Sequence, residues 1–147
     1  MTGSHLPTGT VTLLLADIEG STRLWESDHD SMARGIAVHD RVVADALQRH
    51  NGVRPRDQGE GDAFVAAFER PTDAVACALE IQLGLAQPHD GTPIRLRIGV
   101  HTGEVHKRDE WNYMGTSINR TARVRNIGHG GQVLLSQVTR DLVLDSL

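Results

Sequence analysis

The 147-residue sequence predicts one α+β domain with a ferredoxin-like βαββαβ plan and extra elements at its C-terminal end. The length suits a single compact domain. Strand-like and helix-like segments alternate in the order that this plan requires. No internal repeat, low-complexity tract or linker divides the chain. We therefore assign residues 8–147 to one domain and interpret residues 1–7, which include Gly-Ser-His, as a tail, native or added in cloning.

The first half of the chain should supply the centre of the sheet. A segment rich in Val, Leu and Thr predicts a buried strand. Ser21 or Thr22 can cap the helix that follows, and an Asn-Gly pair predicts the turn after it. Two further expected strands flank a tight turn at 59–62 and predict a hairpin. The expected elements are a strand at 10–16, a helix at 21–49, and strands at 53–58 and 63–68.

The second half should add further helices and strands. Pro71 suits the first turn of a helix, and a glycine-rich break ends a later helix at 128–131. The expected elements are a helix from 71, strands at 94–101 and 104–107, a helix at 115–127, a strand at 132–135 and a last helix from 136. The inward side of the helix from 71 should hold Ala74, Val75, Ala78, Leu79, Ile81 and Leu85.

Composition excludes several classes of protein. The net charge of −4 gives no general attraction to nucleic acid, and no apolar stretch approaches the length of a membrane span. The single cysteine, Cys77, excludes an internal disulfide and favours a reducing, cytoplasmic location, with the thiol as a small core side chain. The histidines show no spacing typical of a zinc site.

Two carboxylates at strand ends predict phosphate chemistry. Asp17 follows the first strand and Asp62 lies in the hairpin turn. Because the first and third strands of the βαββαβ plan are neighbours, both aspartates should reach one end of the sheet. Carboxylates there can hold Mg²⁺ or Mn²⁺, and the turn at 17–22 can present backbone N–H groups to a triphosphate. The alternative is that Asp17 only caps a helix and Asp62 only favours a turn.

Four segments together resemble the signatures of class III adenylate and guanylate cyclase catalytic domains. They are residues 12–25, 59–64 and 97–103, and residues 112–115 followed by Asn119 and Arg123. Among these domains, the chain is most similar to actinobacterial cyclase domains of multidomain regulators with ATPase and LuxR-type DNA-binding modules.

The resemblance implies a role for each matching residue. Asp17, Asp62 and the backbone carbonyl of Ile18 would bind two Mg²⁺ or Mn²⁺ ions. Asn119 would orient the ribose, and Arg123 would stabilise charge in the transition state. The family's metal aspartates and its Asn/Arg helix come from different protomers, so a homodimer is expected. The residues expected to contact the phosphates are Glu19, Gly20, Ser21 and Thr22.

The residues at the purine-reading positions depart from the family pattern. Adenylate cyclases typically hold Lys and Asp there and guanylate cyclases Glu and Cys, whereas this chain holds Gln58 and Asn112. A side-chain amide carries both a hydrogen-bond donor and an acceptor, so the pair could form hydrogen bonds with either adenine or guanine. We expect ATP to be preferred over GTP, with weaker discrimination than a Lys/Asp pair gives.

The chain also ends before the β-hairpin that usually closes the family's domain and often carries a phosphate-binding lysine. Lys107 is the only lysine, and nothing suggests that it substitutes. Arg120 and Arg125 are expected on a solvated helix face, with at most a weak attraction for phosphate. An active adenylate cyclase is the favoured interpretation. The alternatives are a cyclase that uses GTP or both nucleotides, and a nucleotide-sensing or dimerisation module of low activity within a transcriptional regulator.

Overall fold

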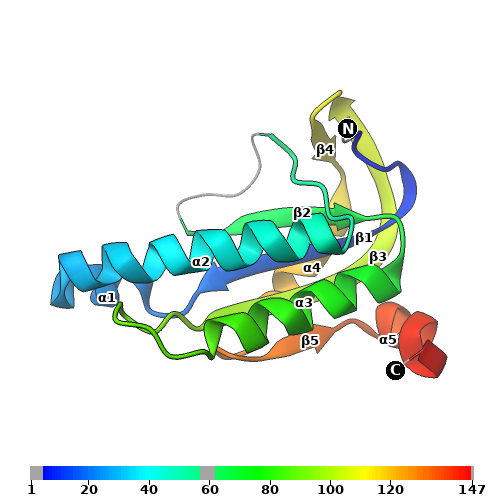
Figure 1. Cartoon of the computed structure of the whole chain (residues 1–147). Helices are drawn as coiled ribbons and strands as arrows, with labels where there is room; N and C mark the ends of the chain where they lie inside the picture. Colours follow the sequence, from blue (N-terminus) through cyan, green and yellow to red (C-terminus); the bar gives the residue numbers. More distant parts are fainter. Residues whose placement is uncertain (1–4, 57–61, 147) are drawn as a thin grey trace.

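The computed structural model describes residues 5–56 and 62–146 (Figure 1). The strands are β1 (Gly9–Ile18), β2 (Phe64–Phe68), β3 (Leu96–Asp109), β4 (Asn112–Met114) and β5 (Val133–Leu135). The helices are α1 (Ser21–Ser27), α2 (His29–Arg49), α3 (Pro71–Leu85), α4 (Thr116–Asn126) and α5 (Gln137–Val143), and a 3₁₀ turn follows at Leu144–Ser146. The predicted α+β class is confirmed.

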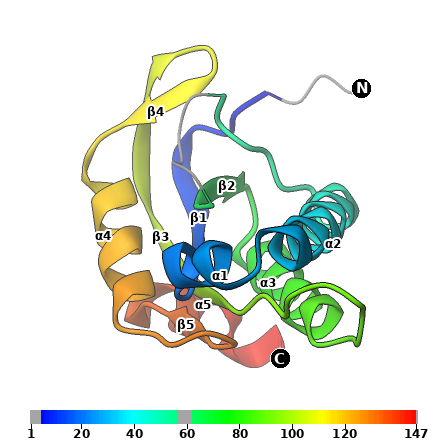
Figure 2. The same ribbon diagram turned by 90° about the vertical axis from the view of Figure 1, so that its left-hand side faces the viewer.

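Strand β1 lies at the centre of the sheet. It pairs antiparallel with β2 on one side and with β3 on the other, and β3 pairs in turn with β4 and β5. Six consecutive residues of β1, Val11 to Ala16, are buried, because both faces of the strand are covered. Figure 2 shows α2 and α3 on one side of the sheet and α4 on the other.

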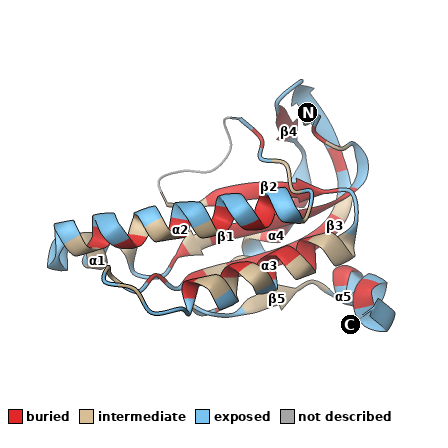
Figure 3. Ribbon diagram, in the orientation of Figure 1, coloured by how far each residue is buried: buried red, intermediate tan, exposed pale blue. Residues whose placement is uncertain are grey.

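Two apolar cores lie on the two faces of the sheet. Alternate residues of β1 divide between them, with Leu14 and Ala16 in one core and Leu13 and Leu15 in the other. The first core packs against α2 and α3, and the second includes Ile118 of α4. In Figure 3, buried residues follow the sheet and the inner sides of the helices. Asp17 continues the alternation, so its side chain belongs to the α4 face.

The helix expected at 21–49 is divided in two. Asp28 has extended backbone angles, φ −158° and ψ 94°, and its carboxylate accepts a hydrogen bond from the Ser31 N–H at 3.0 Å. Asp28 is therefore the N-cap of α2 and ends α1 at the same point. The expectation of one continuous helix was wrong because this internal cap was overlooked.

Two expectations about strands were also wrong. Of the strand expected at 53–58, the described residues 53–56 contribute only an isolated bridge between Val53 and Ala67. The strands expected at 94–101 and 104–107 are one strand, β3, because it stays paired with β1 from Val105 to Leu96. The short strand β4 was not expected and forms a hairpin with the far end of β3.

Helix α3 follows its prediction closely. It begins at Pro71, and five of the six residues expected on its inner side are buried; Leu79 is exposed. Cys77 is fully buried among them, and burial raises the pKa of its thiol to about 12. A thiol that stays protonated at neutral pH is a core side chain and no nucleophile. No helix in the described part of the chain combines the length and the apolarity that a membrane crossing needs.

Candidate active site

Asp17, at the end of β1, lies against an arginine of the neighbouring strand. The register of β1 and β3 places Asp17 opposite Arg97. The Arg97 Nε donates to Asp17 Oδ1 at 2.8 Å, and a terminal nitrogen of Arg97 donates to Oδ2. This hydrogen bonding raises the pKa of the Arg97 guanidinium. A bidentate pair of this kind fixes the orientation of the Asp17 carboxylate.

A second arginine approaches the same carboxylate from α4. The Arg125 Nε lies 3.7 Å from Asp17 Oδ2, and the side chain of Arg125 is only 16% exposed. The expectation that Arg125 belongs to a solvated face was therefore wrong. The sequence analysis missed both arginines as members of the site, since their meeting at Asp17 depends on strand register and helix packing.

Gly99 explains how the end of α4 comes so close to the sheet. A Cβ added at Gly99 would lie 2.7 Å from the Cα of Arg125, closer than Cβ atoms approach other atoms in proteins. The absence of a side chain at Gly99 lets α4 rest directly on β3, two residues from Arg97. This contact sets the position of Arg125 beside Asp17.

Gly99→Ala should therefore force α4 away from β3. We expect the free energy of unfolding to fall by about 1–3 kcal/mol, the usual cost of overpacking, as measured by urea denaturation. Gly128→Ala is the control, because its added methyl group would lie 3.2 Å from the flexible end of the Leu134 side chain. If Gly99→Ala is as stable as the unmodified chain, the close packing of α4 on β3 is not as described.

Asp62 lies near Asp17 along the sheet. The last residue pair of β1 and β2 joins Ala16 to Phe64, so Asp17 is one residue beyond Ala16 and Asp62 two residues before Phe64. Asp62 lines a cavity of about 210 Å³ together with His39 and Asp40 of α2. The two aspartates therefore lie near the same edge of the sheet, Asp17 on its α4 face and Asp62 beside α2. Their carboxylate oxygens are the donors that Mg²⁺ and Mn²⁺ prefer.

These aspartates do not belong to a larger ready-made metal cluster. In residues 5–56 and 62–146, no group of three or more His, Cys, Asp or Glu side chains is arranged to hold a metal ion. Cation binding at Asp17 would also have to compete with Arg97 and Arg125. The donor chemistry fits a hard divalent cation, provided that other ligands come from the substrate or from water.

The turn after Asp17 leads directly into α1. Ile18 is buried, and the Glu19 N–H donates to the Arg95 carbonyl at 2.9 Å. The Glu19 carboxylate accepts a hydrogen bond from the Gly130 N–H at 2.9 Å. Gly20 has a φ of 68° and precedes the first residue of α1, Ser21. Hydrogen bonds to Arg95 and Gly130 therefore hold the turn in place. Its left-handed residue is Gly20, and glycine adopts this backbone conformation without steric cost.

Asn119 and Arg123 lie on the exposed side of α4, four residues apart. The other side of α4, which includes Ser117 and Thr121, is buried against the sheet. Arg123 and Arg125 are two residues apart, about 200° around the helix, so they point to nearly opposite sides. Within one chain, α4 directs Arg125 toward Asp17 and directs Asn119 and Arg123 toward solvent.

Asn112 lies at the opposite end of β3 from Asp17. Asn112 pairs with Asp109 of β3, whereas Asp17 pairs with Arg97. Asp109 and Arg97 are twelve residues apart on β3, which corresponds to roughly 40 Å of strand. Asn112 is buried, and its Nδ2 lies 3.2 Å from the Asp109 Oδ1 to which it donates. A hydrogen bond from the Trp111 backbone N–H lowers the pKa of Asp109.

The predicted partner of Asn112, Gln58, lies outside the described residues. Arg56, however, approaches the β3–β4 hairpin. Its backbone N–H donates to the Trp111 carbonyl at 2.9 Å, and its guanidinium lies 4.4 Å from the centre of the Trp111 ring. The chain just before residue 57 is thus tied to the residue next to Asn112.

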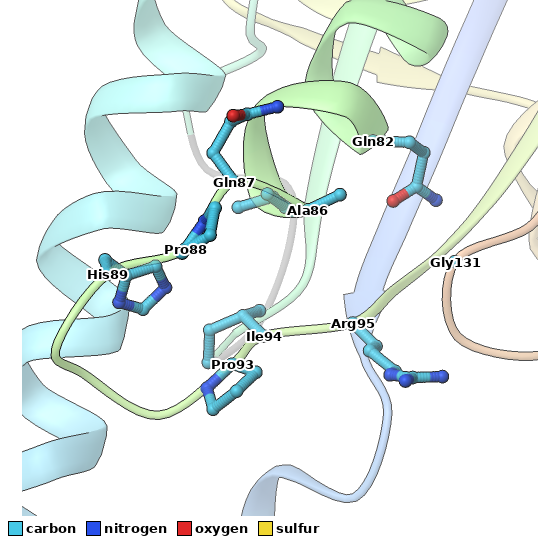
Figure 4. Close-up of a pocket in the computed structure, with 10 residues that line it drawn as sticks. Gln82, Ala86, Gln87, Pro88, His89, Pro93, Ile94, Arg95 and Gly131 are labelled. Atoms are coloured by element: carbon cyan, nitrogen blue, oxygen red, sulfur yellow. The ribbon is translucent and has the colours of Figure 1, made fainter.

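A cavity of about 540 Å³ lies elsewhere, between the end of α3 and the start of β3 (Figure 4). Its walls include Leu85, Pro88, His89 and Ile94. None of the residues predicted to bind metal, phosphate or purine lines it. This cavity is therefore separate from the predicted site.

Comparison with known proteins gives a consistent result. The family description "Adenylate and Guanylate cyclase catalytic domain" matches residues 4–146. The uncharacterized protein Rv0891c of Mycobacterium tuberculosis is 57% identical over 142 residues, which are 96% of this chain and 47% of that protein. The chain thus spans about half the length of this relative.

Solved structures with the same fold include cyclases of both kinds. An adenylate cyclase from Trypanosoma brucei, solved in its monomeric state, superposes with a TM-score of 0.83 at 27% identity, covering 99% of this chain and 79% of that one. The guanylyl cyclase Cya2 superposes with a TM-score of 0.78 at 26% identity, covering 92% of this chain and 80% of that one. The fold is therefore compatible with either purine.

Proposed function

Because this chain belongs to the class III adenylate/guanylate cyclase catalytic domain family, we propose that it converts ATP into 3′,5′-cyclic AMP and pyrophosphate at sites shared between two copies of the chain. One observation carries the shared site. Asp17 and the pair Asn119 and Arg123 face different ways in one chain, so a second chain has to supply one set to the other.

The carboxylates of Asp17 and Asp62, with the backbone carbonyl of Ile18, are proposed to hold two Mg²⁺ or Mn²⁺ ions. When bound, these ions would activate the ribose 3′-hydroxyl and offset the charge of the leaving pyrophosphate. Arg97 has to release at least one of its hydrogen bonds to Asp17 for a cation to bind there. The guanidinium is then available to an anion beside the same carboxylate.

The turn formed by Glu19, Gly20, Ser21 and Thr22 is proposed to hold the triphosphate through backbone N–H groups. Its hydrogen bonds to Arg95 and Gly130 support this role, because they fix the turn before any ligand arrives. The Glu19 side chain is bonded to Gly130 and its backbone N–H to Arg95, so the N–H groups of Gly20, Ser21 and Thr22 are the ones proposed to meet phosphate.

From the partner chain, Asn119 is proposed to orient the ribose, and Arg123 to stabilise the negative charge that develops during transfer. Both are exposed, as residues that act on another molecule must be. A planar guanidinium that is always charged suits the task of Arg123. The attack of the 3′-hydroxyl is intramolecular, so holding the ribose and the triphosphate in line lowers much of the barrier.

Gln58 and Asn112 are proposed to contact the purine. The hydrogen bond to Asp109 fixes the Asn112 side chain beside the β3–β4 hairpin, and an amide is a group that can pair with the adenine amine. Amides are weaker and less selective partners than charged groups. A cyclase that uses GTP, or both nucleotides, is therefore the second candidate, and the adenylate and guanylyl cyclases among the structural relatives are compatible with it.

The domain is proposed to work in the cytoplasm, where ATP is supplied and thiols stay reduced. The length of the mycobacterial relative leaves room for further domains. ATPase and DNA-binding modules are our proposal for them.

The product formed from each nucleotide tests this function. At high protein concentration with Mn²⁺, we expect cyclic AMP from ATP in severalfold excess over cyclic GMP from GTP, since both amides are compatible with adenine. Separation of the products by chromatography measures both. Excess cyclic GMP would overturn the choice of ATP. Absence of product from a confirmed dimer would contradict the enzyme and favour a nucleotide-sensing module.

A further inference from the structure

We propose that Arg125 binds the triphosphate of the nucleotide held at Asp17 of its own chain, while Asn119 and Arg123 of the same helix serve the partner's site. This inference rests on the proposed function and deepens it, because it assigns a phosphate-binding group that the family signatures in this sequence do not include. Helix α4 would then act on two sites at once, one through each side.

The position of Arg125 is the first support for this assignment. Its Nε lies 3.7 Å from Asp17 Oδ2, and both side chains are largely buried, with exposed fractions of 16% and 21%. Gly99 holds the end of α4 against β3, and the Arg125 Nε donates to Asn126 Oδ1 at 3.1 Å. The guanidinium is therefore placed before any ligand binds, which reduces the entropy lost on binding.

The balance of charge at Asp17 is the second support. Two guanidiniums, Arg97 and Arg125, face one carboxylate, and the nearby Glu19 carboxylate is turned to the Gly130 N–H. Together with Asp17, the Glu19 carboxylate balances the charge of the two arginines when no ligand is bound. Divalent cations at Asp17 would repel both arginines, so a guanidinium held this close needs a further anion. A triphosphate bound to the same cations supplies that anion.

The geometry of the helix decides which nucleotide Arg125 serves. Arg125 contacts Asp17 of its own chain, whereas Arg123 points about 200° away around α4. One arginine therefore cannot reach the site that the other serves. Arg125 acts with Asp17 of the same chain and Arg123 with Asp17 of the other chain.

Mixing inactive variants tests this division. In a heterodimer of Arg123→Ala and Arg125→Ala chains, one site combines the intact Asp17 and Arg125 of the first chain with the intact Arg123 of the second. Each heterodimer then has one complete site instead of two, so we expect it to have about half the activity of an unmodified dimer. A mixture of Asp17→Ala and Arg125→Ala chains should stay inactive, because one site lacks Asp17 and the other lacks Arg125. The reverse pattern would overturn the assignment.

A third mixture, Asp17→Ala with Arg123→Ala, keeps failure of this inference apart from failure of the proposed function. Its recovery depends on the shared site alone and not on Arg125. If it recovers while the Arg123→Ala and Arg125→Ala mixture does not, only the role of Arg125 is refuted. If it also fails, with heterodimers shown to form, the shared site itself is wrong.

Binding of pyrophosphate distinguishes a phosphate ligand from a residue that only holds Asp17. By calorimetry in Mn²⁺, we expect Arg125→Ala to weaken pyrophosphate binding about 10- to 100-fold, the usual range for a lost charge-assisted contact. Arg125→Lys should retain part of it, and Arg120→Ala, an exposed arginine of the same helix, should change it less than twofold. Binding of Mn²⁺ alone should not weaken in Arg125→Ala. Equal weakening of Mn²⁺ and pyrophosphate binding would show that Arg125 only positions Asp17.

Discussion

Asp17→Ala is expected to abolish metal-dependent formation of the cyclic nucleotide, with a loss of at least about 100-fold in turnover. The substitution removes one of the two carboxylates proposed to hold the cations, and no other described acidic side chain contacts Arg97 and Arg125 in its place. Turnover with Mn²⁺ and ATP measures the effect. Asp17→Asn is the matched variant, because it keeps the shape of the side chain and removes only the charge.

The fold of Asp17→Ala should survive. Asp17 lies outside both apolar cores and its side chain is 21% exposed, so the substitution leaves core packing unchanged. A circular dichroism spectrum and a melting temperature close to those of the unmodified chain are the control. Full activity in a folded Asp17→Ala or Asp17→Asn chain would refute the proposed metal site.

Arg123→Ala is expected to lower kcat by about 100- to 1,000-fold while changing the KM for ATP little. The reason is that its guanidinium is proposed to meet charge that is present only in the transition state. Steady-state kinetics at saturating Mn²⁺ separate the two constants. Stability should be unaffected, because Arg123 is exposed and makes no described ion pair.

The exposed Arg120, three residues earlier on α4, supplies the control for this variant. Arg120→Ala also removes a guanidinium from the exposed part of the helix, yet it should keep kcat within a factor of about two. An equal loss in both variants would show that α4 contributes only a general positive charge. A loss confined to KM in Arg123→Ala would indicate that Arg123 binds the substrate before the reaction.

The central strand and helix α3 could be predicted because their signals are local. A run of buried apolar residues identifies β1, and Pro71 marks the start of α3. The break at Asp28 had a local signal too, a cap that accepts from Ser31, but the surrounding helical residues outweighed it. Val53 shows the limit of such reasoning, since a segment becomes a strand only if a neighbouring strand pairs along its length.

The candidate site was predictable in its residue types and not in its contacts. Asp17 could be identified from its place after a strand, but its pairing with Arg97 depends on the register of β1 and β3, which is a property of the folded sheet. Arg125 was expected on a solvated helix face, where most arginines lie. Its burial arises from Gly99, a residue on a distant strand whose missing side chain admits the helix.

The position of Asn112 could not be interpreted within one chain. It lies at one end of β3 and Asp17 at the other, so two predicted parts of one site are separated by the length of a strand. Sequence motifs reveal which residues take part and not which chain supplies them. The separation supports a site built from two chains, in which the far end of one β3 approaches the Asp17 of the other.

The most direct test of this account is the activity of an equimolar mixture of Asp17→Ala and Arg123→Ala chains, each inactive alone. The account predicts that mixing restores formation of the cyclic nucleotide, because each heterodimer has one site with an intact Asp17 from one chain and an intact Arg123 from the other. Activity that stays at the level of the separate variants, while native mass spectrometry shows that heterodimers have formed, would contradict the shared site.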